Sequence, residues 1–455
     1  MMLSQLSRIV GGSFTGSDVN FDSVSIDTRT LCKNALFVAL KGPNFNGHDF
    51  ISSARKRGAA AALVSEQVSD VLPVAKVADT RLALGTLAAS WRANFEIPVV
   101  AVTGSNGKTT VKEMLSSIFT QACGGNKSHV LSTIGNLNND LGLPLTLLRL
   151  RKCHRYAVTE MGMNHPGELS YLTSIARPDV AVITNAAAAH LQGLQSVEGV
   201  ARAKAEIFSG VKAEGTAVIN DDDKYASLWR QLAGDLKIIS FSLQHDVDVT
   251  AEFDLHTDNS TLETHTPWGD ASFRLALPGR HNIANALAAV AAAGTVGVSL
   301  TDIVAGLEHW HGVAGRQQTK TIHGIQVIDD SYNANPASIS AALEVLAMQD
   351  GMKIFVLGDM GELGENSAAF HEQAGKLAKE LAIDACYTLG DQTRLTAQAF
   401  GNGAYFFTEP EQLVGALQKE IHNNRGRSVS IQVKGSRAMK MEKNIEQLEQ
   451  KGTGD

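Results

Sequence analysis

The sequence predicts an α/β protein of three domains, built on mostly parallel sheets with helices on their faces. The length of 455 residues suits two to four domains. Short apolar strands alternate with helical segments along most of the chain, which is typical of parallel sheets. The alternation starts again after residue 312, so another doubly wound sheet is expected there. We predict domains at residues 1–80, 81–312 and 313–455.

The first part of the chain predicts a small N-terminal α/β domain. Residues 35–40 (ALFVAL) form a short apolar strand, and the loop KGPNFNGHDF follows. A helix is expected at 51–57 and a strand at 60–64. Another helix, at about 80–94, leads to Pro98, which marks the entry to the next domain.

The middle of the chain predicts a mostly parallel sheet with helices on both faces. A β-branched run at 99–102 precedes the loop TGSNGKTT, and the apolar residues after this loop recur on one face of a helix. Residues 248–277 alternate polar and apolar, which predicts antiparallel hairpin strands. The stretch PGRHNIANALAAVAAA then opens a helix. Further strands are expected at 156–160, 180–184 and 217–220.

The last part of the chain predicts a C-terminal α/β domain of the Rossmann-like kind, because strands and helices again alternate. Strands are expected at 325–328, 354–357, 386–389 and 429–433. Helices are expected at 336–347, 367–381, 410–422 and 438–450.

Composition narrows the class of protein. The formal net charge is −7, so no global basic field favours a nucleic-acid partner. The four cysteines form no C-x-x-C pair, which argues against a zinc site and a disulfide framework. The N-terminus lacks the apolar length of a signal peptide, and no run of 18 apolar residues occurs. We expect a cytoplasmic protein without membrane insertion.

The loop TGSNGKTT, residues 103–110, is the sharpest motif. Its glycines let several NH groups point inward, and the helix that follows adds a partial positive charge at its N-terminus. Lys108 can reach the β- and γ-phosphates of a nucleotide, and the Thr109 hydroxyl can bind Mg²⁺. The spacing is G-x-x-G-K-T, since Val102 stands where the common pattern has its first glycine. We predict phosphate binding in a central domain like that of a P-loop ATPase.

Three further positions have residue types that bind metal ions. Glu160 ends an apolar strand, His190 follows the strand VAVITN, and Lys204 stands with Glu206 on an expected helix. Each also has an ordinary interpretation: a solvated loop carboxylate, a structural histidine and a surface lysine. The spacing of these residues leaves both interpretations open.

Three polar loops follow strands of the last domain and can meet at one edge of its sheet. They are DDSYNANPAS (329–338), LGDMGELG (357–364) and VKGSR (433–437). Such a cluster favours a ligand site, although the same residue types are common in ordinary turns.

The chain as a whole resembles the Mur ligases and their relative folylpolyglutamate synthase. The resemblance rests on TGSNGKTT, PGRHNIANALAA, GVAGR, DDSYNANP and VKGSR, in that order. Within the family, SIDTRT, ALKGPNFNGHDF, GNLNNDLGLPLTLL, NAAAAHLQG and AKAEIFSG are similar to the branch that acts on D-alanyl-D-alanine. The D-N-P-R signature of the sibling that adds meso-diaminopimelate is absent. The resemblance implies an ATP-dependent ligase that adds D-alanyl-D-alanine to a UDP-N-acetylmuramoyl-tripeptide through an acyl phosphate.

The resemblance also implies a role for individual residues. Lys108, Lys204 and His190 would be catalytic. Magnesium would be bound by Thr109, Glu160, His190 and Lys204, the lysine carrying CO₂ as a carbamate. ATP would be bound by Gly104, Ser105, Asn106, Gly107, Lys108, Thr109, Thr110, Asn282, Arg316, Asp330, Tyr332 and Asn333. Asp27, Thr28, Arg29 and His48 would hold the uridine nucleotide, and Asn136, Asn138 and Asn139 would face the tripeptide.

Other functions stay open at this point. A sibling ligase would share the ATP loop, but a folate enzyme would not need a uridine site. A nucleotide-dependent switch or ATPase would hydrolyse ATP without either co-substrate, and a non-catalytic nucleotide-binding module would not turn over. The third residue of the tripeptide, meso-diaminopimelate or lysine, is also open. We expect a monomer.

Overall fold

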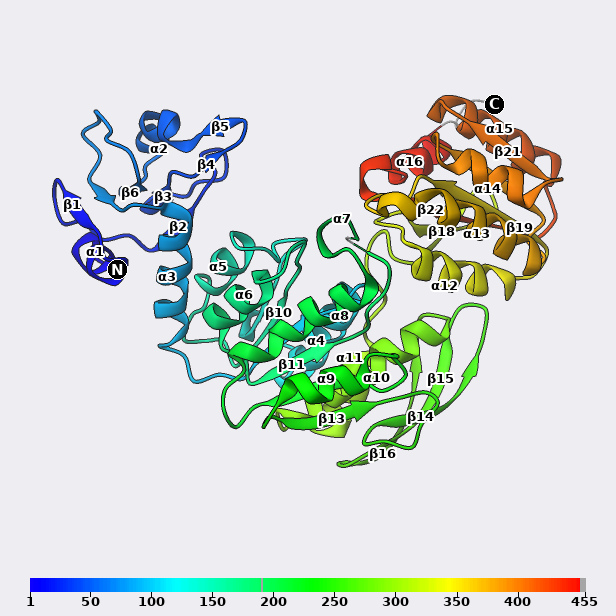
Figure 1. The fold of residues 1–455 in the computed structure, drawn as a ribbon, viewed down its shortest axis with the longest axis horizontal. Coiled ribbons are helices and arrows are strands. Elements are labelled where there is room, and N and C mark those ends of the chain that lie inside the picture. Colours follow the sequence, from blue (N-terminus) through cyan, green and yellow to red (C-terminus); the bar gives the residue numbers. More distant parts are fainter. Residues whose placement is uncertain (190, 451–455) are drawn as a thin grey trace.

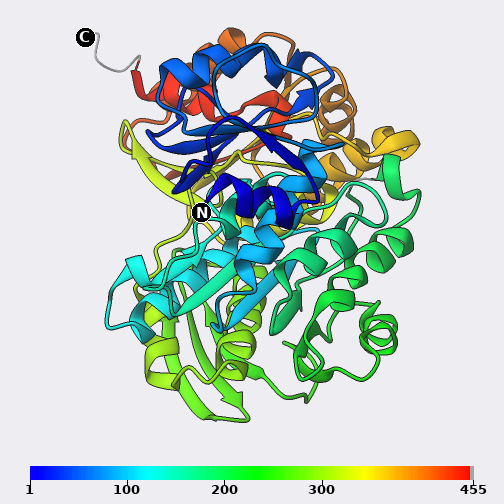
Figure 2. The ribbon, with the colours of Figure 1, turned by 90° about the vertical axis from the view of Figure 1, so that its left-hand side faces the viewer.

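The computed structural model describes residues 1–189 and 191–450. The chain forms three lobes: an N-terminal lobe (α1 to β7), a central lobe (α3 to α11) and a C-terminal lobe (β17 to α16). In Figure 1 the N-terminal lobe lies at the upper left and the C-terminal lobe at the upper right, apart from each other and both above the central lobe. The view in Figure 2 places both of them on the same side of the central lobe. The predicted three-part α/β architecture is confirmed.

The N-terminal lobe is a small sheet of order β1-β7-β6-β3-β2, parallel except for β1. All four residues of β3 and of β6 are apolar and buried, as in strands covered on both faces. The elements are α1 (Leu3–Ile9), β1 (Ser13–Thr15), β2 (Ser23–Ser25), β3 (Ala35–Val38), β4 (Lys41–Gly42), β5 (Phe45–Asn46), η1 (Gly47–Phe50), α2 (Ile51–Lys56), β6 (Ala61–Val64) and β7 (Val74–Lys76).

Helix α3 (Thr80–Arg92) joins the N-terminal and central lobes. Asp79 caps its first turn by accepting hydrogen bonds from the backbone of Arg81 and Leu82. Leu84 and Leu87 belong to the core of the N-terminal lobe, whereas Ala88 packs into the central core. The helix is therefore shared by two hydrophobic cores, and its apolar faces fix how the lobes meet.

The central lobe has a six-stranded parallel sheet of order β13-β12-β11-β8-β10-β9 and an antiparallel sheet β14-β15-β16. Both were predicted, apart from the short strands β9 and β13. Its elements are β8 (Val99–Thr103), α4 (Lys108–Ala122), η2 (Lys127–His129), β9 (Val130–Ser132), α5 (Gly142–Leu147), β10 (Tyr156–Glu160), α6 (Glu168–Ala176), β11 (Val180–Ile183), α7 (Leu191–Leu194), α8 (Val197–Ala205), η3 (Glu206–Gly210), β12 (Thr216–Asn220), α9 (Ala226–Ala233), β13 (Lys237–Phe241), β14 (Thr250–Leu255), β15 (Ser260–Thr266), β16 (Gly269–Leu275), α10 (Arg280–Thr295) and α11 (Leu300–Glu308).

Hydrophobic burial explains why β8 lies inside this sheet. Its five residues, VVAVT, are all buried, with a core on each face of the sheet. Val111, Met114 and Leu115 of α4 fill one of these cores, as their helical spacing predicts. Because β8 and α4 flank residues 103–110, the loop is held between two rigid, buried elements.

The C-terminal lobe is a second doubly wound unit, of order β17-β18-β22-β19-β20-β21, parallel except for β17. The helix expected at 438–450 begins only at Glu442, because Lys440 has a left-handed backbone (φ 49°) that interrupts it. The elements are β17 (Gln318–Ile322), β18 (Ile325–Asp330), α12 (Pro336–Ala347), β19 (Met352–Gly358), η4 (Gly364–Asn366), α13 (Ser367–Glu380), β20 (Ala385–Leu389), α14 (Thr393–Phe400), β21 (Ala404–Phe407), α15 (Pro410–Asn423), β22 (Val429–Lys434), η5 (Arg437–Met439) and α16 (Glu442–Gln450).

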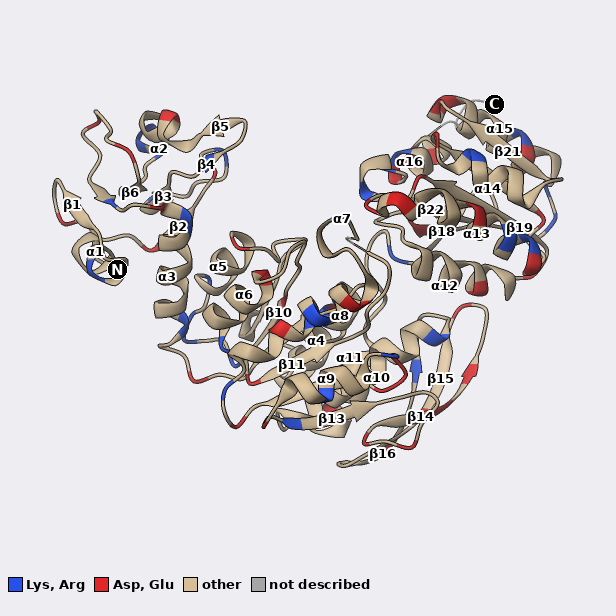
Figure 3. Cartoon of the chain, in the orientation of Figure 1, with Lys and Arg blue, Asp and Glu red and all other residues tan. Residues whose placement is uncertain are grey.

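Basic residues and acidic residues both occur in all three lobes (Figure 3). Within residues 1–189 and 191–450, none of the helices has the length and apolar character needed to cross a bilayer.

Candidate active site

A large cavity lies at the carboxyl ends of the central parallel strands, where ligands of open α/β sheets bind. Its volume is about 1150 Å³. The wall includes the loop at residues 103–110, the ends of β10 and β11, and helices α8 and α10. The C-terminal lobe adds the β18–α12 loop and α12, and the start of α3 closes the far end. The cavity is therefore shared by the central and C-terminal lobes.

The loop at residues 103–110 needs glycine at two positions. Gly107 has a left-handed backbone (φ 81°) at the start of α4, and a Cβ there would overlap the side-chain oxygen of Asn285. A Cβ on Gly104 would likewise overlap the hydroxyl of Thr184. No side chain caps α4, so its first NH groups are available to an anion such as phosphate.

The loop is braced by residues that follow β11. The backbone NH of Ser105 donates to the carbonyl of Asn185 at 3.0 Å, and that of Asn106 donates to Asn185 Oδ1 at 2.9 Å. The Thr184 hydroxyl donates to the Asn106 carbonyl at 2.5 Å. These bonds hold the loop in one shape, so its NH groups are oriented in advance.

Lys108 is half-buried in the wall of the cavity, next to the loop. Its Nζ donates to the carbonyls of Gly104 at 2.5 Å and Ser105 at 3.4 Å. Burial lowers the pKa of Lys108, and the nearby Arg316 guanidinium lowers it further, whereas Glu160 acts in the opposite direction. The lysine is thus a fixed donor beside the NH groups of the loop.

Glu160 forms a second centre next to the loop, and its side chain is only 3% exposed. The Thr109 hydroxyl donates to Glu160 Oε2 at 2.8 Å, and the Asn138 amide donates to Oε1 at 2.8 Å. Arg316 Nη2 in turn donates to Thr109 Oγ1 at 3.0 Å. A carboxylate and a hydroxyl are hard oxygen ligands of the kind that Mg²⁺ prefers, so this pair fits a magnesium ion.

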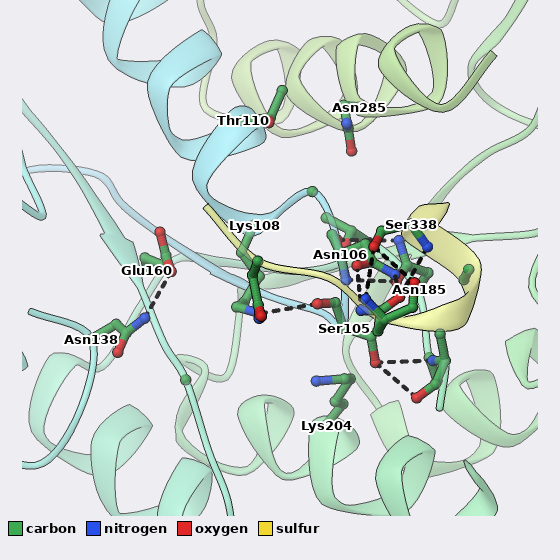
Figure 4. Close-up of a pocket in the computed structure, with 18 of the residues that line it drawn as sticks. Ser105, Asn106, Lys108, Thr110, Asn138, Glu160, Asn185, Lys204, Asn285 and Ser338 are labelled. Atoms are coloured by element: carbon green, nitrogen blue, oxygen red, sulfur yellow. Dashed lines mark hydrogen bonds between the residues drawn. The ribbon is translucent and has the colours of Figure 1, made fainter. Parts of the chain in front are cut away.

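Lys204 reaches the same region from α8, and its side chain points toward the loop in Figure 4. The residue is 2% exposed, and its ammonium donates to none of the described residues. Burial holds the pKa of Lys204 well below its ordinary value, and the charge of Lys108 adds to the effect. Glu206 faces elsewhere, because its carboxylate accepts from Gly167 N and Ser170 N at the start of α6.

The other expected metal ligand, His190, lies outside the described residues. Among the residues that are described, no three His, Cys, Asp or Glu side chains gather into a metal-binding group. Any cation beside Glu160 would therefore need ligands in addition to the Glu160 carboxylate and the Thr109 hydroxyl.

The C-terminal lobe contacts this centre directly. Asn335 Nδ2 donates to Asn106 Oδ1 at 2.7 Å, across the two lobes. The Arg316 guanidinium lies 4.3 Å from the centre of the Tyr332 ring, and its buried Nε has no hydrogen-bond partner among the described residues. This unpaired donor points to an anionic ligand.

Asp330 and Asn333 are tied together by one lysine. Lys434 Nζ donates to Asp330 Oδ2 at 2.7 Å and to the Asn333 carbonyl at 3.0 Å. On the opposite wall, the Asn282 amide donates to Gln317 Oε1 at 2.9 Å, in the first turn of α10. The structure therefore brings the expected residues of α10 and of the β18–α12 loop to one cavity.

Comparison with known proteins agrees with this geometry. Residues 20–92 match the Mur ligase family catalytic domain, residues 102–293 the Mur ligase middle domain, and residues 315–437 the Mur ligase glutamate ligase domain. The UDP-N-acetylmuramoyl-tripeptide--D-alanyl-D-alanine ligase of Escherichia coli K12 is 44% identical over 454 residues, which is 99% of each chain. The chain belongs to the Mur ligase family.

Two solved structures show the same Mur ligase architecture. A crystal structure of MurF from Acinetobacter baumannii is 37% identical, with a TM-score of 0.93 over 98% of each chain. The MurF ligase of Thermotoga maritima in complex with ADP is 26% identical, with a TM-score of 0.81 over 94% of this chain and 97% of that one.

The residues expected to hold uridine lie in the N-terminal lobe of this Mur ligase, away from the cavity wall. Asp27 and Arg29 form an exposed ion pair of 2.7 Å in the β2–β3 loop, beside Thr28. Hydrogen bonds from Arg29 lower the pKa of Asp27 to about 2. His48 is buried in η1.

Both ring nitrogens of His48 are engaged within the chain. Nε2 accepts from the backbone NH of Ser65 at 2.9 Å, so Nδ1 carries the proton and donates to Asn46 Oδ1 at 2.7 Å. Burial lowers the pKa of His48. The ring therefore fixes the β5–η1 turn against the strand that precedes Ser65.

The three asparagines expected at the tripeptide have different surroundings. Asn138 and Asn139 line the cavity, but exposed Asn136 does not. Asn138 holds Glu160, whereas Asn139 Oδ1 accepts from Gly142 N at 2.9 Å, at the start of α5. Asn138 is thus the one of the three that joins the cavity to the Glu160 centre.

Several residues of the Mur ligase site were missed from the sequence. Thr184 and Asn185 end a predicted strand, just as Glu160 does, and this position could have indicated them. Asn285 lies one turn after Asn282 on the same helix. Gln317 carries no signal, because its role depends on how the two lobes meet. The residues of the cavity wall missed in this way are Thr184, Asn185, Asn285 and Gln317, whereas Asn335 and Lys434 were predicted only as members of the loops at 329–338 and 433–437.

The bond between Asn335 and Asn106 gives a testable prediction for this Mur ligase. Asn335→Ala is expected to raise the KM for ATP about fivefold, because a neutral interlobe hydrogen bond of about 1 kcal/mol is lost. Asn335 also caps α12, by accepting from Ser338 N. Ser299→Ala is the matched control, since it removes a cap of α11 away from the cavity. Equal KM values for ATP in the two variants would contradict the interlobe role.

Proposed function

We propose that this Mur ligase joins the amine of D-alanyl-D-alanine to the terminal carboxyl group of a UDP-N-acetylmuramoyl-tripeptide, with ATP as the energy source. The enzyme is an ATP-dependent ligase of peptidoglycan precursor synthesis. One observation carries the proposal: the Glu160 centre and Lys108 stand together in a cavity that the C-terminal lobe also lines. The full-length similarity to the Escherichia coli ligase supports the same substrates.

The first step transfers a phosphoryl group between two anions. The terminal carboxylate of the tripeptide attacks the γ-phosphorus of ATP, the bond to the β,γ-bridging oxygen breaks, and an acyl phosphate and ADP form. Lys108 and the NH groups at the start of α4 offset the negative charge on the transferred group. Arg316 can also bind the phosphates, since its buried Nε has no hydrogen-bond partner in residues 1–189 and 191–450.

Magnesium is part of the proposal. Thr109 and Glu160 would hold it, together with His190 and a carbamylated Lys204, which would present an anion in place of a cation. Bound there, it would neutralise phosphate charge beside the reacting oxygen. The burial of Lys204 and its lowered pKa support the carbamate, because CO₂ adds only to a neutral amine.

The second step forms the amide. The neutral amine of D-alanyl-D-alanine attacks the acyl carbonyl, the C–N bond forms, phosphate leaves, and a proton is lost from nitrogen. We assign Asp330, Tyr332 and Asn333 to the side of the cavity that meets ATP and the amine. Contacts from the C-terminal lobe, through Asn335 and Arg316, help to exclude water from the acyl phosphate.

The acyl substrate would extend from the N-terminal lobe to the Glu160 centre. We assign the uridine nucleotide to Asp27, Thr28, Arg29 and His48, with His48 shaping the loop around it, and the tripeptide to Asn136, Asn138 and Asn139. Both ATP and a UDP-linked substrate are molecules of the cytoplasm, so this location belongs to the proposal. A monomer is sufficient, because one chain supplies all the residues named.

Phosphate release with Mg·ATP tests the function. The full reaction is run beside two reactions that each omit one co-substrate. We expect release only when both are present, with UDP-N-acetylmuramoyl-pentapeptide as the product by mass spectrometry. Release that ignores both co-substrates would instead assign the protein to the ATPases.

A further inference from the structure

Lys112 is a buried cation that the reaction described above does not use. It lies on α4, one turn after Lys108, and has no exposed surface as a residue. Its Nζ donates to the Thr133 carbonyl at 3.0 Å and contacts the carboxylate of Glu113. Val111, Met114 and Leu115 on the same helix are apolar and buried.

Stability alone does not favour a lysine at this place. Taking an ammonium group out of water is unfavourable by several kcal/mol, and an apolar side chain of similar volume often serves the fold equally well. Glu113 compensates only in part, because about a third of its own side chain is exposed to solvent. A buried charge with this much desolvation calls for a role in what it touches.

Lys112 contacts the first residue of the loop that contains Asn138. Thr133 follows β9 and begins the loop at residues 133–141. Its hydroxyl accepts from the backbone NH of Glu160 at 3.0 Å, while Asn138, farther along the loop, holds the Glu160 carboxylate. The Glu160 carboxylate also accepts a hydrogen bond from the hydroxyl of Thr109, in the first turn of α4. These bonds close a ring from α4 through Thr133 and Glu160 back to α4.

We propose that Lys112 is a positioning residue of the ligase: it fixes the loop at residues 133–141 to α4, and so sets Asn138 and Glu160 against the phosphate loop. The expected change in KM rests on the proposed function, whereas the expected effect of Lys112 on the loop does not. Because Lys112 bonds neither residues 103–107 nor α10, its loss acts on the loop at residues 133–141 and leaves the backbone of the phosphate loop in place. Its loss therefore separates the affinities for the two substrates.

Three variants of the full-length protein test this inference. Lys112→Met keeps an unbranched side chain but loses the donor, Lys112→Arg keeps a donor, and Glu113→Gln is the control that keeps the bond to Thr133. We expect Lys112→Met to raise the KM for UDP-N-acetylmuramoyl-tripeptide about tenfold, as for loss of a charge-assisted hydrogen bond. The affinity for ADP without magnesium should stay within about twofold, because Glu160 acts on the nucleotide through magnesium. Lys112→Arg should recover part of the loss, and Glu113→Gln should behave like the wild type.

Hydrogen exchange supplies a readout that needs no substrate. We expect faster exchange at residues 133–141 in Lys112→Met than in the wild type, with unchanged exchange in α10 as the internal reference. If Lys112→Met does not fold, Lys112→Gln replaces it, since glutamine keeps a polar side chain but loses the charge of the ammonium group that binds the Thr133 carbonyl. The same shift in KM and exchange is then expected.

Two results would overturn the inference. One is an unchanged KM for the tripeptide with unchanged exchange. The other is a parallel loss of affinity for both substrates together with the melting temperature, which indicates a purely structural lysine. The wild type is assayed alongside: absence of the pentapeptide product there would reject the proposed function, whereas the exchange data would still decide the role of Lys112.

Discussion

Lys108→Ala is expected to lower kcat/KM by at least about 100-fold, or ~3 kcal/mol of transition-state stabilisation, as for removal of a major electrostatic contact. The physical reason is the position of the ammonium group. It lies in the cavity wall, held by the carbonyls of Gly104 and Ser105, and so stays directed at the charge that develops on the γ-phosphate. Steady-state kinetics of phosphate release measure the effect.

Lys376→Met serves as the control for Lys108→Ala. Lys376 lies on α13, with a side chain that is more than half exposed and that pairs with Glu372. Its loss removes a positive charge from the chain without changing the cavity, so wild-type activity is expected. Activity of Lys108→Ala within about tenfold of the wild type would reject its role in phosphoryl transfer.

Lys204→Ala is expected to lose at least about 100-fold in kcat, and short carboxylic acids are expected to restore part of it. Alanine leaves a space in α8 beside the phosphate loop, and a small carboxylate can occupy it in place of the carbamate. Activity is measured with and without acetate. Circular dichroism confirms that the variant is folded, and a folded variant that acetate does not rescue would argue against the carbamate.

The depressed pKa of Lys204 also predicts a pH dependence. In the wild type at fixed dissolved CO₂, activity should fall as the pH is lowered through the folded pKa of Lys204, because the ammonium form cannot accept CO₂. For the same reason the folded state binds fewer protons than the unfolded chain between this pKa and the ordinary lysine value. Stability therefore rises with pH across that window. In Lys204→Ala rescued by acetate, activity should not show this fall at low pH.

The central part of the fold could be predicted because its signals are local. The β-branched run before residue 103 and the helical spacing of Val111, Met114 and Leu115 are strong, so β8, α4 and the loop between them were identified. Short edge strands gave weaker signals. Strands β13 (237–241) and β21 (404–407) lie at the edges of their sheets, where each pairs with a single neighbouring strand, and both were missed.

The parts of the site that depend on tertiary contacts could not be predicted. Asn335 meets Asn106 across 229 residues of sequence, and nothing local indicates that pair. Lys112 has the residue type of a solvated helix position, yet the end of β9 covers it. His48 was predicted at the nucleotide from its motif. The structure adds that both ring nitrogens of His48 already have hydrogen-bond partners. These partners depend on how η1 packs against Ser65, which the sequence does not show.

The strand order of the C-terminal lobe has a consequence for how the protein emerges during synthesis. β22 (Val429–Lys434) pairs with β18 on one side and β19 on the other, so the last strand made is the one that joins the two halves of the sheet. While this strand is still inside the ribosome, β17–β18 and β19–β21 have no common partner. Asp330 cannot yet meet Lys434, and the wall that this lobe gives to the cavity is incomplete. The nascent chain can finish its nucleotide-binding half well before that wall is in place, so the cavity is complete only after residues 429–434 have emerged.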